Sequence, residues 1–164
     1  MVLLLYTFHT VGGRAEKITV KSGKDAVTIL NPAIDVAVIQ FNSSKNYAVA
    51  TIGNYTTKGK QWLLMTGFPA KDQSKQRLLT AGAVWEKEKA AFAAAKDQYS
   101  VENGRELVYT NQSSGGMSGG GVFDTEGRLV GVNTGSEDSV VIENGDYQEI
   151  SLGYSLARIS HKLN

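Results

Sequence analysis

The chain has 164 residues, of which 41% are hydrophobic and 20% charged, a composition typical of one soluble globular domain. Its 17 basic and 16 acidic residues give a net charge of +1, which provides no electrostatic basis for binding nucleic acid or an anionic membrane. The chain has no cysteine, which excludes disulfides, zinc thiolates and cysteine nucleophiles, and its two histidines are too few for a histidine-rich metal site.

The first half of the chain consists of short apolar segments separated by turns. Its opening run, VLLLYT at 2–7, is too short for a signal peptide or a membrane span and predicts a buried strand. Natural domains seldom begin so abruptly, so we expect sequence upstream of this run, and the compartment stays open. Further strands are predicted at 17–21, 26–30, 35–41, 47–53, 61–68 and 77–85.

Residues 86–98 are rich in Ala, Glu and Lys and predict a helix, although an exposed extension of a hairpin fits them equally well. We predict that Trp62 and Trp85 are core or interface aromatics. The second half returns to strands and ends in a short helix; the strands are predicted at 105–111, 119–124, 128–135, 139–145 and 147–156, and the helix at 158–164. So many short strands with Gly, Asn and Asp turns favour a barrel or a sandwich.

Residues 111–135 contain eight glycines around Ser118. Glycine loses the most conformational freedom on folding, so such a run indicates that the backbone needs an unusual path. Small residues on both sides of Ser118 allow a sharp bend that exposes its hydroxyl. The same bend frees nearby N–H groups to point at one spot, as an oxyanion hole requires.

The pentapeptide GMSGG at 116–120 formally fits the G-x-S-x-G nucleophile elbow of α/β-hydrolases. That elbow opens a helix, and its histidine follows the serine in the chain. Here three glycines and a predicted strand–turn–strand follow Ser118. The only histidine downstream is His161, which we expect to be a solvated or helix-capping residue. The context therefore argues against the elbow.

The segment GMSGGGVFDTEGRLVGV instead resembles the nucleophile loop of the trypsin-like (chymotrypsin-fold) serine peptidases, where G-x-S-G-G-P precedes a hairpin. DVAVIQF at 35–41 resembles the aspartate strand of that family, and LYTFHTV at 5–11 is similar to its L-T-A-A-H-V signature. GFPA at 67–70 is similar to the turn before the second barrel. The resemblance covers essentially the whole chain and is closest to bacterial members without disulfides, including cyanobacterial ones.

The resemblance implies an all-β fold of two antiparallel Greek-key β-barrels, the first of them N-terminally incomplete because two strands that normally precede the histidine strand are missing here. Residues 1–66 would form the first barrel, and residues 67–164 the second barrel with the serine loop and specificity pocket. Two departures from the family pattern are Tyr6, where Ser or Thr is usual, and Gly121, where Pro is usual.

The same resemblance assigns roles in peptide-bond hydrolysis through an acyl-enzyme. His9 would be the general base, Asp35 the carboxylate that orients it, and Ser118 the nucleophile. The backbone N–H groups of Gly116 and Ser118 would form the oxyanion hole. No metal or organic cofactor is implied.

The substrate would be a polypeptide, bound extended along the pocket strand by main-chain hydrogen bonds. Gln112 would lie near the base of the primary specificity pocket, Asn133 and Thr134 would line the cleft, and Gly153 would form the far wall. Because Gln112 is neutral, we expect a small or medium neutral side chain at P1.

Two other functions remain open. A catalytically inactive domain could keep the groove as a peptide-binding module, and an esterase-like hydrolase could use the same site. The sequence leaves the oligomeric state undetermined.

Overall fold

The computed structural model describes residues 2–6, 27–29, 36–41, 44–54, 61–71, 76–85, 106–141 and 147–159. The strand predicted at 17–21 and the helix predicted at 86–98 lie outside these residues. So do three residues singled out from the sequence, His9, Asp35 and His161.

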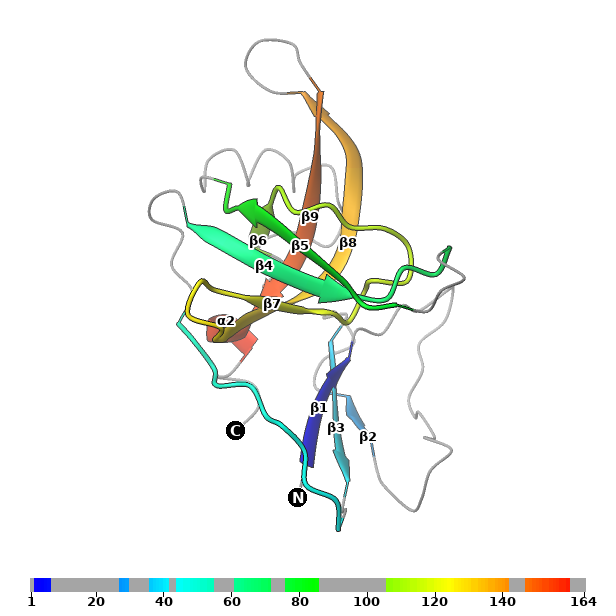
Figure 1. Ribbon diagram of the computed structural model, residues 1–164, viewed down its shortest axis with the longest axis vertical. Helices are drawn as coiled ribbons and strands as arrows, with labels where there is room; N and C mark the ends of the chain where they lie inside the picture. Colours follow the sequence, from blue (N-terminus) through cyan, green and yellow to red (C-terminus); the bar gives the residue numbers. More distant parts are fainter. Residues whose placement is uncertain are drawn as a thin grey trace.

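The larger of the two sheets in the described residues is a six-stranded antiparallel sheet (Figure 1). Its strand order is β5-β4-β7-β8-β9-β6. The strands are β4 (Trp62–Gly67), β5 (Leu78–Ala83), β6 (Leu107–Tyr109), β7 (Gly121–Phe123), β8 (Leu129–Val141) and β9 (Tyr147–Ser155). The all-β prediction is confirmed, as are the individual strands predicted around β4, β5, β6, β7 and β9.

The sheet curls until its two edge strands meet. Val84, directly after β5, forms an antiparallel bridge with Tyr109 in β6. Next to this bridge, Trp85 N donates to Val108 O at 2.9 Å and Thr110 N donates to Ala83 O at 3.0 Å. The six strands therefore curl around the main core cluster, to which Leu63, Met65, Leu107 and Tyr109 belong.

Gly82 allows this close approach. A Cβ atom at Gly82 would clash with the backbone nitrogen of Asn111, and it would lie 2.5 Å from Asn111 Oδ1. The Asn111 side chain in turn joins the two sides of the seam, because its Nδ2 donates to Leu63 O at 3.0 Å and to Thr80 O at 2.8 Å.

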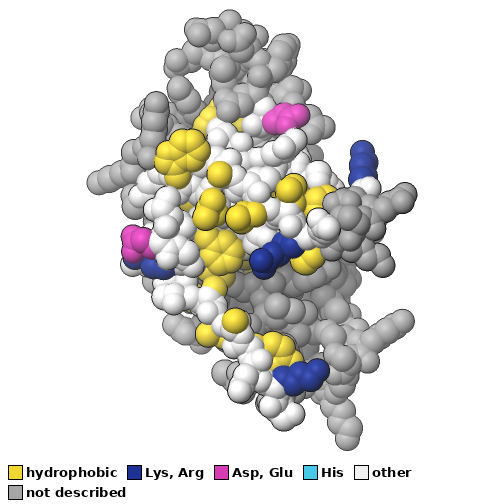
Figure 2. All heavy atoms as spheres, viewed as in Figure 1, with side chains coloured by type: hydrophobic (Ala, Val, Ile, Leu, Met, Phe, Trp, Pro, Cys, Tyr) yellow, Lys and Arg dark blue, Asp and Glu magenta, His cyan; other side chains and the backbone are white. Residues whose placement is uncertain are grey.

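Alternation along β4 directs Leu63 and Met65 into the core, where each buried side chain contributes about 1.5–3 kcal/mol. Both tryptophans were predicted to be core or interface aromatics, and Trp85 packs against the core residues Val108, Ile150 and Leu152. Trp62 is 62% exposed on the outer face of β4, so for this residue only the interface alternative stays as a prediction. Figure 2 shows hydrophobic side chains across this face of the molecule.

Two strand predictions need correction. Residues 128–135 and 139–145 were expected as separate strands, but a single strand of 13 residues, β8, runs from Leu129 to Val141. The pairing of β8 with β9 is irregular at two places, between Asn133 and Gly135 and between Glu137 and Val140. Such irregularities let a strand continue past residues that do not fit the regular register.

Residues 47–53 are not a strand. Their apolar alternation fits a half-buried strand, but Val49 is 84% exposed and only Ile52 forms a bridge, parallel to Leu129. Two hydrogen bonds hold the end of the segment there, from Gly53 N to Leu129 O and from Leu129 N to Thr51 O. The apolar alternation gave a wrong prediction here, because a segment forms a strand only where a neighbouring strand pairs with it along its length.

The N-terminal residues form a separate antiparallel sheet of three described strands in the order β1-β3-β2. They are β1 (Val2–Tyr6), β2 (Val27–Ile29) and β3 (Ala37–Phe41), as predicted. The first barrel, which the family resemblance implies to be N-terminally incomplete, stays a prediction. The six-stranded sheet begins at Trp62, so the boundary predicted between residues 66 and 67 falls within β4.

Val36, directly before β3, connects the two sheets. It is 1% exposed and packs in one cluster with Val132, Tyr154 and Leu156. Leu156 begins the short helix α2 (Leu156–Ile159), two residues before the helix expected at the C-terminus. Among the described residues, no helix has the length and apolar character needed to cross a membrane.

We predict that Gly82→Ala destabilises the protein by about 1–3 kcal/mol, because the added methyl group forces the seam apart. The matched control is Gly115→Ala, where a Cβ would meet no atom within 4 Å, and its effect should stay within about 0.5 kcal/mol. Urea unfolding measures both. Equal stability of the two variants would contradict the role given to Gly82.

A second prediction concerns Asp124 in the turn between β7 and β8. Burial raises the pKa of its carboxyl, but hydrogen bonds from Arg128 and from Glu126 N, together with the charge of Arg128, bring the pKa below its ordinary value. A lowered pKa in the folded state contributes stability above the unfolded value of about 3.9 and loses it as the pH falls through the folded value.

The free energy of unfolding of the wild type should therefore exceed that of Asp124→Asn at pH 6, and the difference should shrink as the pH falls below about 4. Urea titrations of both proteins, at pH 6 and at a pH below about 4, measure this difference in the free energy of unfolding. A difference that does not depend on pH would show that the carboxylate charge contributes nothing to the turn.

Candidate active site

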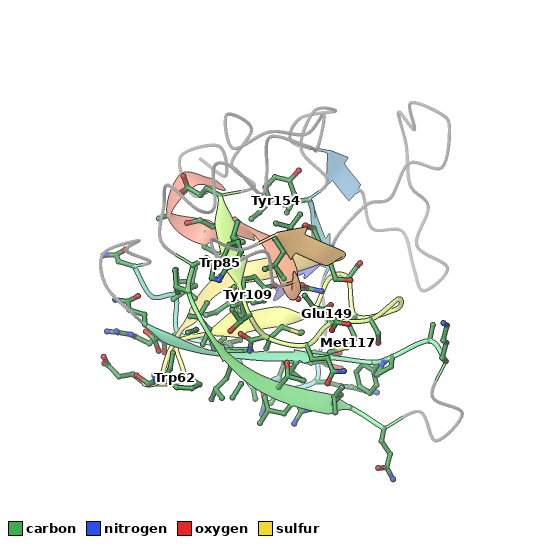
Figure 3. The ribbon with its side chains drawn as sticks, turned by 90° about the horizontal axis from the view of Figure 1, so that it is seen from above. Trp62, Trp85, Tyr109, Met117, Glu149 and Tyr154 are labelled. Atoms are coloured by element: carbon green, nitrogen blue, oxygen red, sulfur yellow. The ribbon has the colours of Figure 1, made fainter. Side chains whose placement is uncertain are left out.

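Ser118 lies in the loop between β6 and β7, and its neighbour Met117 anchors that loop. Met117 is 1% exposed and belongs to the main core cluster with Leu63, Met65 and Tyr109 (Figure 3). A Cβ on Gly67 would lie only 2.8 Å from the Met117 Cβ, so β4 passes directly against this side chain. Met117 is not among the site residues predicted from the sequence, although a large apolar residue among glycines and serines is an available signal.

Ser118 itself is half-buried. Its Oγ donates a hydrogen bond to the carbonyl oxygen of Thr134 at 3.2 Å. On the far side of the loop, Gly120 passes so close to β4 that a Cβ there would clash with the Thr66 carbonyl oxygen. The serine is therefore held between β4 and β8.

Asn133 in β8 bonds to the loop on both sides of Ser118. Its main chain accepts from Gly119 N and donates to Gly120 O, both at 2.8 Å. Its side-chain Nδ2 donates to Met117 O at 3.1 Å and to Ser113 Oγ at 3.0 Å. Asn133 is fully buried, so its side chain bonds to the loop from the interior of the protein.

Thr134 occupies an irregularity in the pairing of β8 with β9. Asn133 pairs with Gly153 and Gly135 pairs with Leu152, so the pairing register shifts at Thr134. Such bulges often reorient groups beside active sites. Here the bulge turns the Thr134 carbonyl to Ser118 Oγ, while Thr134 Oγ1 donates to Leu152 O at 3.1 Å.

Two peptide planes in the loop have their carbonyl groups fixed by protein donors. Ala70 N donates to Gly115 O at 2.7 Å, and Met117 O accepts from Gly120 N and Asn133 Nδ2, both at 3.1 Å. In a trans peptide the C=O and the following N–H point in opposite directions. The N–H groups of Gly116 and Ser118 therefore point away from these donors, and within the described residues neither donates to a protein acceptor.

Gly116 needs to be glycine for this arrangement. Its φ of 96° lies in the left-handed region, and a Cβ there would clash with Ala70 N. The loop thus has a backbone that no other residue type adopts without strain at this position.

The remaining site predictions concern Gln112, Gly153, His9 and Asp35. Gln112 is exposed, and its carbonyl accepts from Thr80 Oγ1 at 3.1 Å. Gly153 is buried in β9, where a Cβ would lie 2.7 Å from Val132 O. His9 and Asp35 lie outside the described residues. The structure therefore brings Gly116, Ser118, Asn133 and Thr134 together.

The described parts of the chain contain no cluster of three or more His, Cys, Asp or Glu side chains that could hold a metal ion. The chemistry that the described site offers consists of a hydroxyl group and backbone N–H groups.

We predict that Met117→Ala costs about 2–5 kcal/mol of stability, because it leaves a cavity in the core and releases the loop. Met117→Leu nearly conserves the volume and should cost less than about 1.5 kcal/mol. Thermal and urea unfolding measure both variants. If alanine were tolerated as well as leucine, Met117 would not be the anchor of the loop.

Three solved structures of peptidases have a similar fold. An HtrA-type protease, AlgW, with a decapeptide has a TM-score of 0.59 and 20% identity over 98% of this chain and 48% of the AlgW chain. AlgW with a tripeptide has a TM-score of 0.60 and 21% identity, over 97% and 50% of the two chains. The Rv3671c protease in an inactive form has a TM-score of 0.63 and 16% identity, over 98% of this chain and 77% of that one.

This chain therefore spans about half the length of the AlgW chains. A search among curated proteins found no match. The sequence profile of the trypsin-like peptidase domain, by contrast, matches residues 7–132, well over half of the chain and a range that includes His9, Asp35 and Ser118. On this match the chain belongs to the family of trypsin-like peptidase domains.

Proposed function

We propose that this domain is a serine endopeptidase with Ser118 as its nucleophile. Ser118 Oγ attacks the peptide carbonyl while His9 accepts its proton, and His9 then donates that proton to the leaving amine. The acyl group stays on Ser118 until water, deprotonated by His9, releases the acid and regenerates the serine. Asp35 holds the imidazole in the orientation that this exchange requires.

The observation that carries the proposal is the direction of the two N–H groups beside Ser118. The carbonyls of Gly115 and Met117 are fixed by protein donors, and within the described part of the chain the N–H groups of Gly116 and Ser118 have no protein acceptor, which supports a role in binding an external oxyanion. Preorganised donors of this kind stabilise the oxyanion of a tetrahedral intermediate, where loss of one donor typically costs a factor of 10²–10³ in kcat.

The pairing of the small sheet supports the roles of His9 and Asp35. Tyr6 lies opposite Ala37, so the chain leaves β1 toward His9 and enters β3 from Asp35 at the same end of the sheet. Val36, next to Asp35, packs against Val132, two residues before Thr134. The start of β3 therefore lies beside β8, the strand whose Thr134 carbonyl accepts from Ser118 Oγ, which supports the roles proposed for His9 and Asp35.

A polypeptide substrate fits the same geometry. AlgW, whose fold is similar, has been crystallised with peptides. We propose that a peptide binds extended beside Thr134 and that Gln112, Asn133, Thr134 and Gly153 contribute to the substrate pocket. A small or medium neutral P1 side chain suits the uncharged character of these four residues.

We predict that a fluorophosphonate labels the wild-type chain and that Ser118→Ala, His9→Ala and Asp35→Asn abolish or strongly slow the labelling. The matched control is Ser114→Ala, an exposed serine of the same loop, which should be labelled like the wild type. Mass spectrometry of the adduct identifies the modified residue.

Labelling of Ser118→Ala at the wild-type rate would refute the nucleophile. An unlabelled, folded wild type that still binds peptides would favour the peptide-binding module. Cleavage of small activated esters but of no peptide would favour the esterase.

A further inference from the structure

Tyr109 lies deep in the core, in β6, and its hydroxyl is linked to the serine loop through Asn133. It is 0% exposed, and its hydroxyl donates to Asn133 Oδ1 at 2.5 Å. Neither the acyl-transfer chemistry nor the substrate pocket proposed above uses this hydroxyl.

The hydrogen-bond partners of Asn133 determine which way its amide faces. Nδ2 donates to Met117 O, and a carbonyl oxygen can only accept a hydrogen bond. If the amide were flipped, Oδ1 would face Met117 O and two acceptors would repel each other. Oδ1 therefore faces Tyr109, and the phenol must be the donor of the bond between them.

The direction of Met117 O has a consequence for Ser118. This oxygen belongs to the same peptide plane as the Ser118 N–H, and the two point in opposite directions. A donor that pulls Met117 O inward therefore turns the Ser118 N–H outward. The series Tyr109 hydroxyl, Asn133 amide, Met117 carbonyl thus links a core phenol to one of the two proposed oxyanion donors.

We propose that Tyr109 is a positioning residue, whose hydroxyl holds the Asn133 amide in the orientation that directs the Ser118 N–H toward the oxyanion. This inference rests on the proposed peptidase function. Without the phenol, Asn133 Oδ1 loses this donor in a fully buried position. Any rotation of the amide toward another donor takes Nδ2 away from Met117 O.

The test compares Tyr109→Phe with Leu63→Val. Both variants alter the same core, but only the first removes the hydroxyl. Well below the unfolding temperature of each variant, Tyr109→Phe should lower kcat for a small activated ester by about 10- to 100-fold and leave KM within about twofold. Leu63→Val should keep the wild-type kcat.

A double-mutant cycle with Asn133→Asp sharpens the test, because the carboxylate has no N–H to donate to Met117 O. If both residues act on one peptide plane, the loss in kcat of the double variant should be well below the product of the two single losses. If the loss in kcat of the double variant equalled the product of the two single losses, Tyr109 and Asn133 would act independently, which would contradict the proposal.

A second readout does not depend on turnover. The amide signal of Ser118 in the ¹⁵N–¹H spectrum should shift in Tyr109→Phe and stay in place in Leu63→Val. An unchanged Ser118 signal together with kcat within twofold of the wild type would overturn the inference. If the wild type showed no turnover dependent on Ser118, the peptidase proposal would fail, and the amide signal would still decide whether Tyr109 orients the loop.

Discussion

The side-chain amide of Asn133 has one donor group and one acceptor oxygen, and the serine loop is built on that difference. Its Nδ2 holds the Met117 carbonyl and Ser113 Oγ, while its Oδ1 accepts from Tyr109. Because a carbonyl cannot donate, only one orientation satisfies all these partners. Buried networks of this kind favour a single arrangement when every member is satisfied, since an unpaired group in the interior is costly. The geometry beside Ser118 follows from this constraint.

The rest of the sheet keeps β8 and the loop close enough for these bonds to form. The edge strands close at Gly82, where only a hydrogen atom fits beneath the backbone of Asn111. Gly120 brings the end of the loop against the Thr66 carbonyl in the same way. Met117 then fills the space enclosed by the strands. Two of the glycines around Ser118, Gly116 and Gly120, are thus required by close backbone contacts and, at Gly116, by a φ of 96°.

Local patterns predicted most of the fold. The apolar run at 61–68 predicted β4, and the glycines around Ser118 predicted a sharp bend that exposes the serine hydroxyl, where the structure has a half-buried serine. Predictions failed where the outcome depended on distant partners. Residues 47–53 have a strand pattern but pair with β8 at Ile52 alone, and β8 continues through polar residues because β9 pairs with it on both sides of two irregularities. The Tyr109–Asn133 bond joins residues 24 positions apart, and no local pattern could indicate it. The order His9, Asp35, Ser118 came from family resemblance, and the matched profile supports the family.

The central claim is that the loop presents the Gly116 and Ser118 N–H groups to the oxyanion of a Ser118 adduct. A crystal structure of the chain with a peptidyl phosphonate tests it most directly. We predict a covalent bond between phosphorus and Ser118 Oγ, with one phosphonyl oxygen about 2.7–3.1 Å from both nitrogens and the His9 imidazole beside the serine. An adduct on another residue would contradict the account. So would a Ser118 adduct whose oxygen points to solvent while the two N–H groups face the protein.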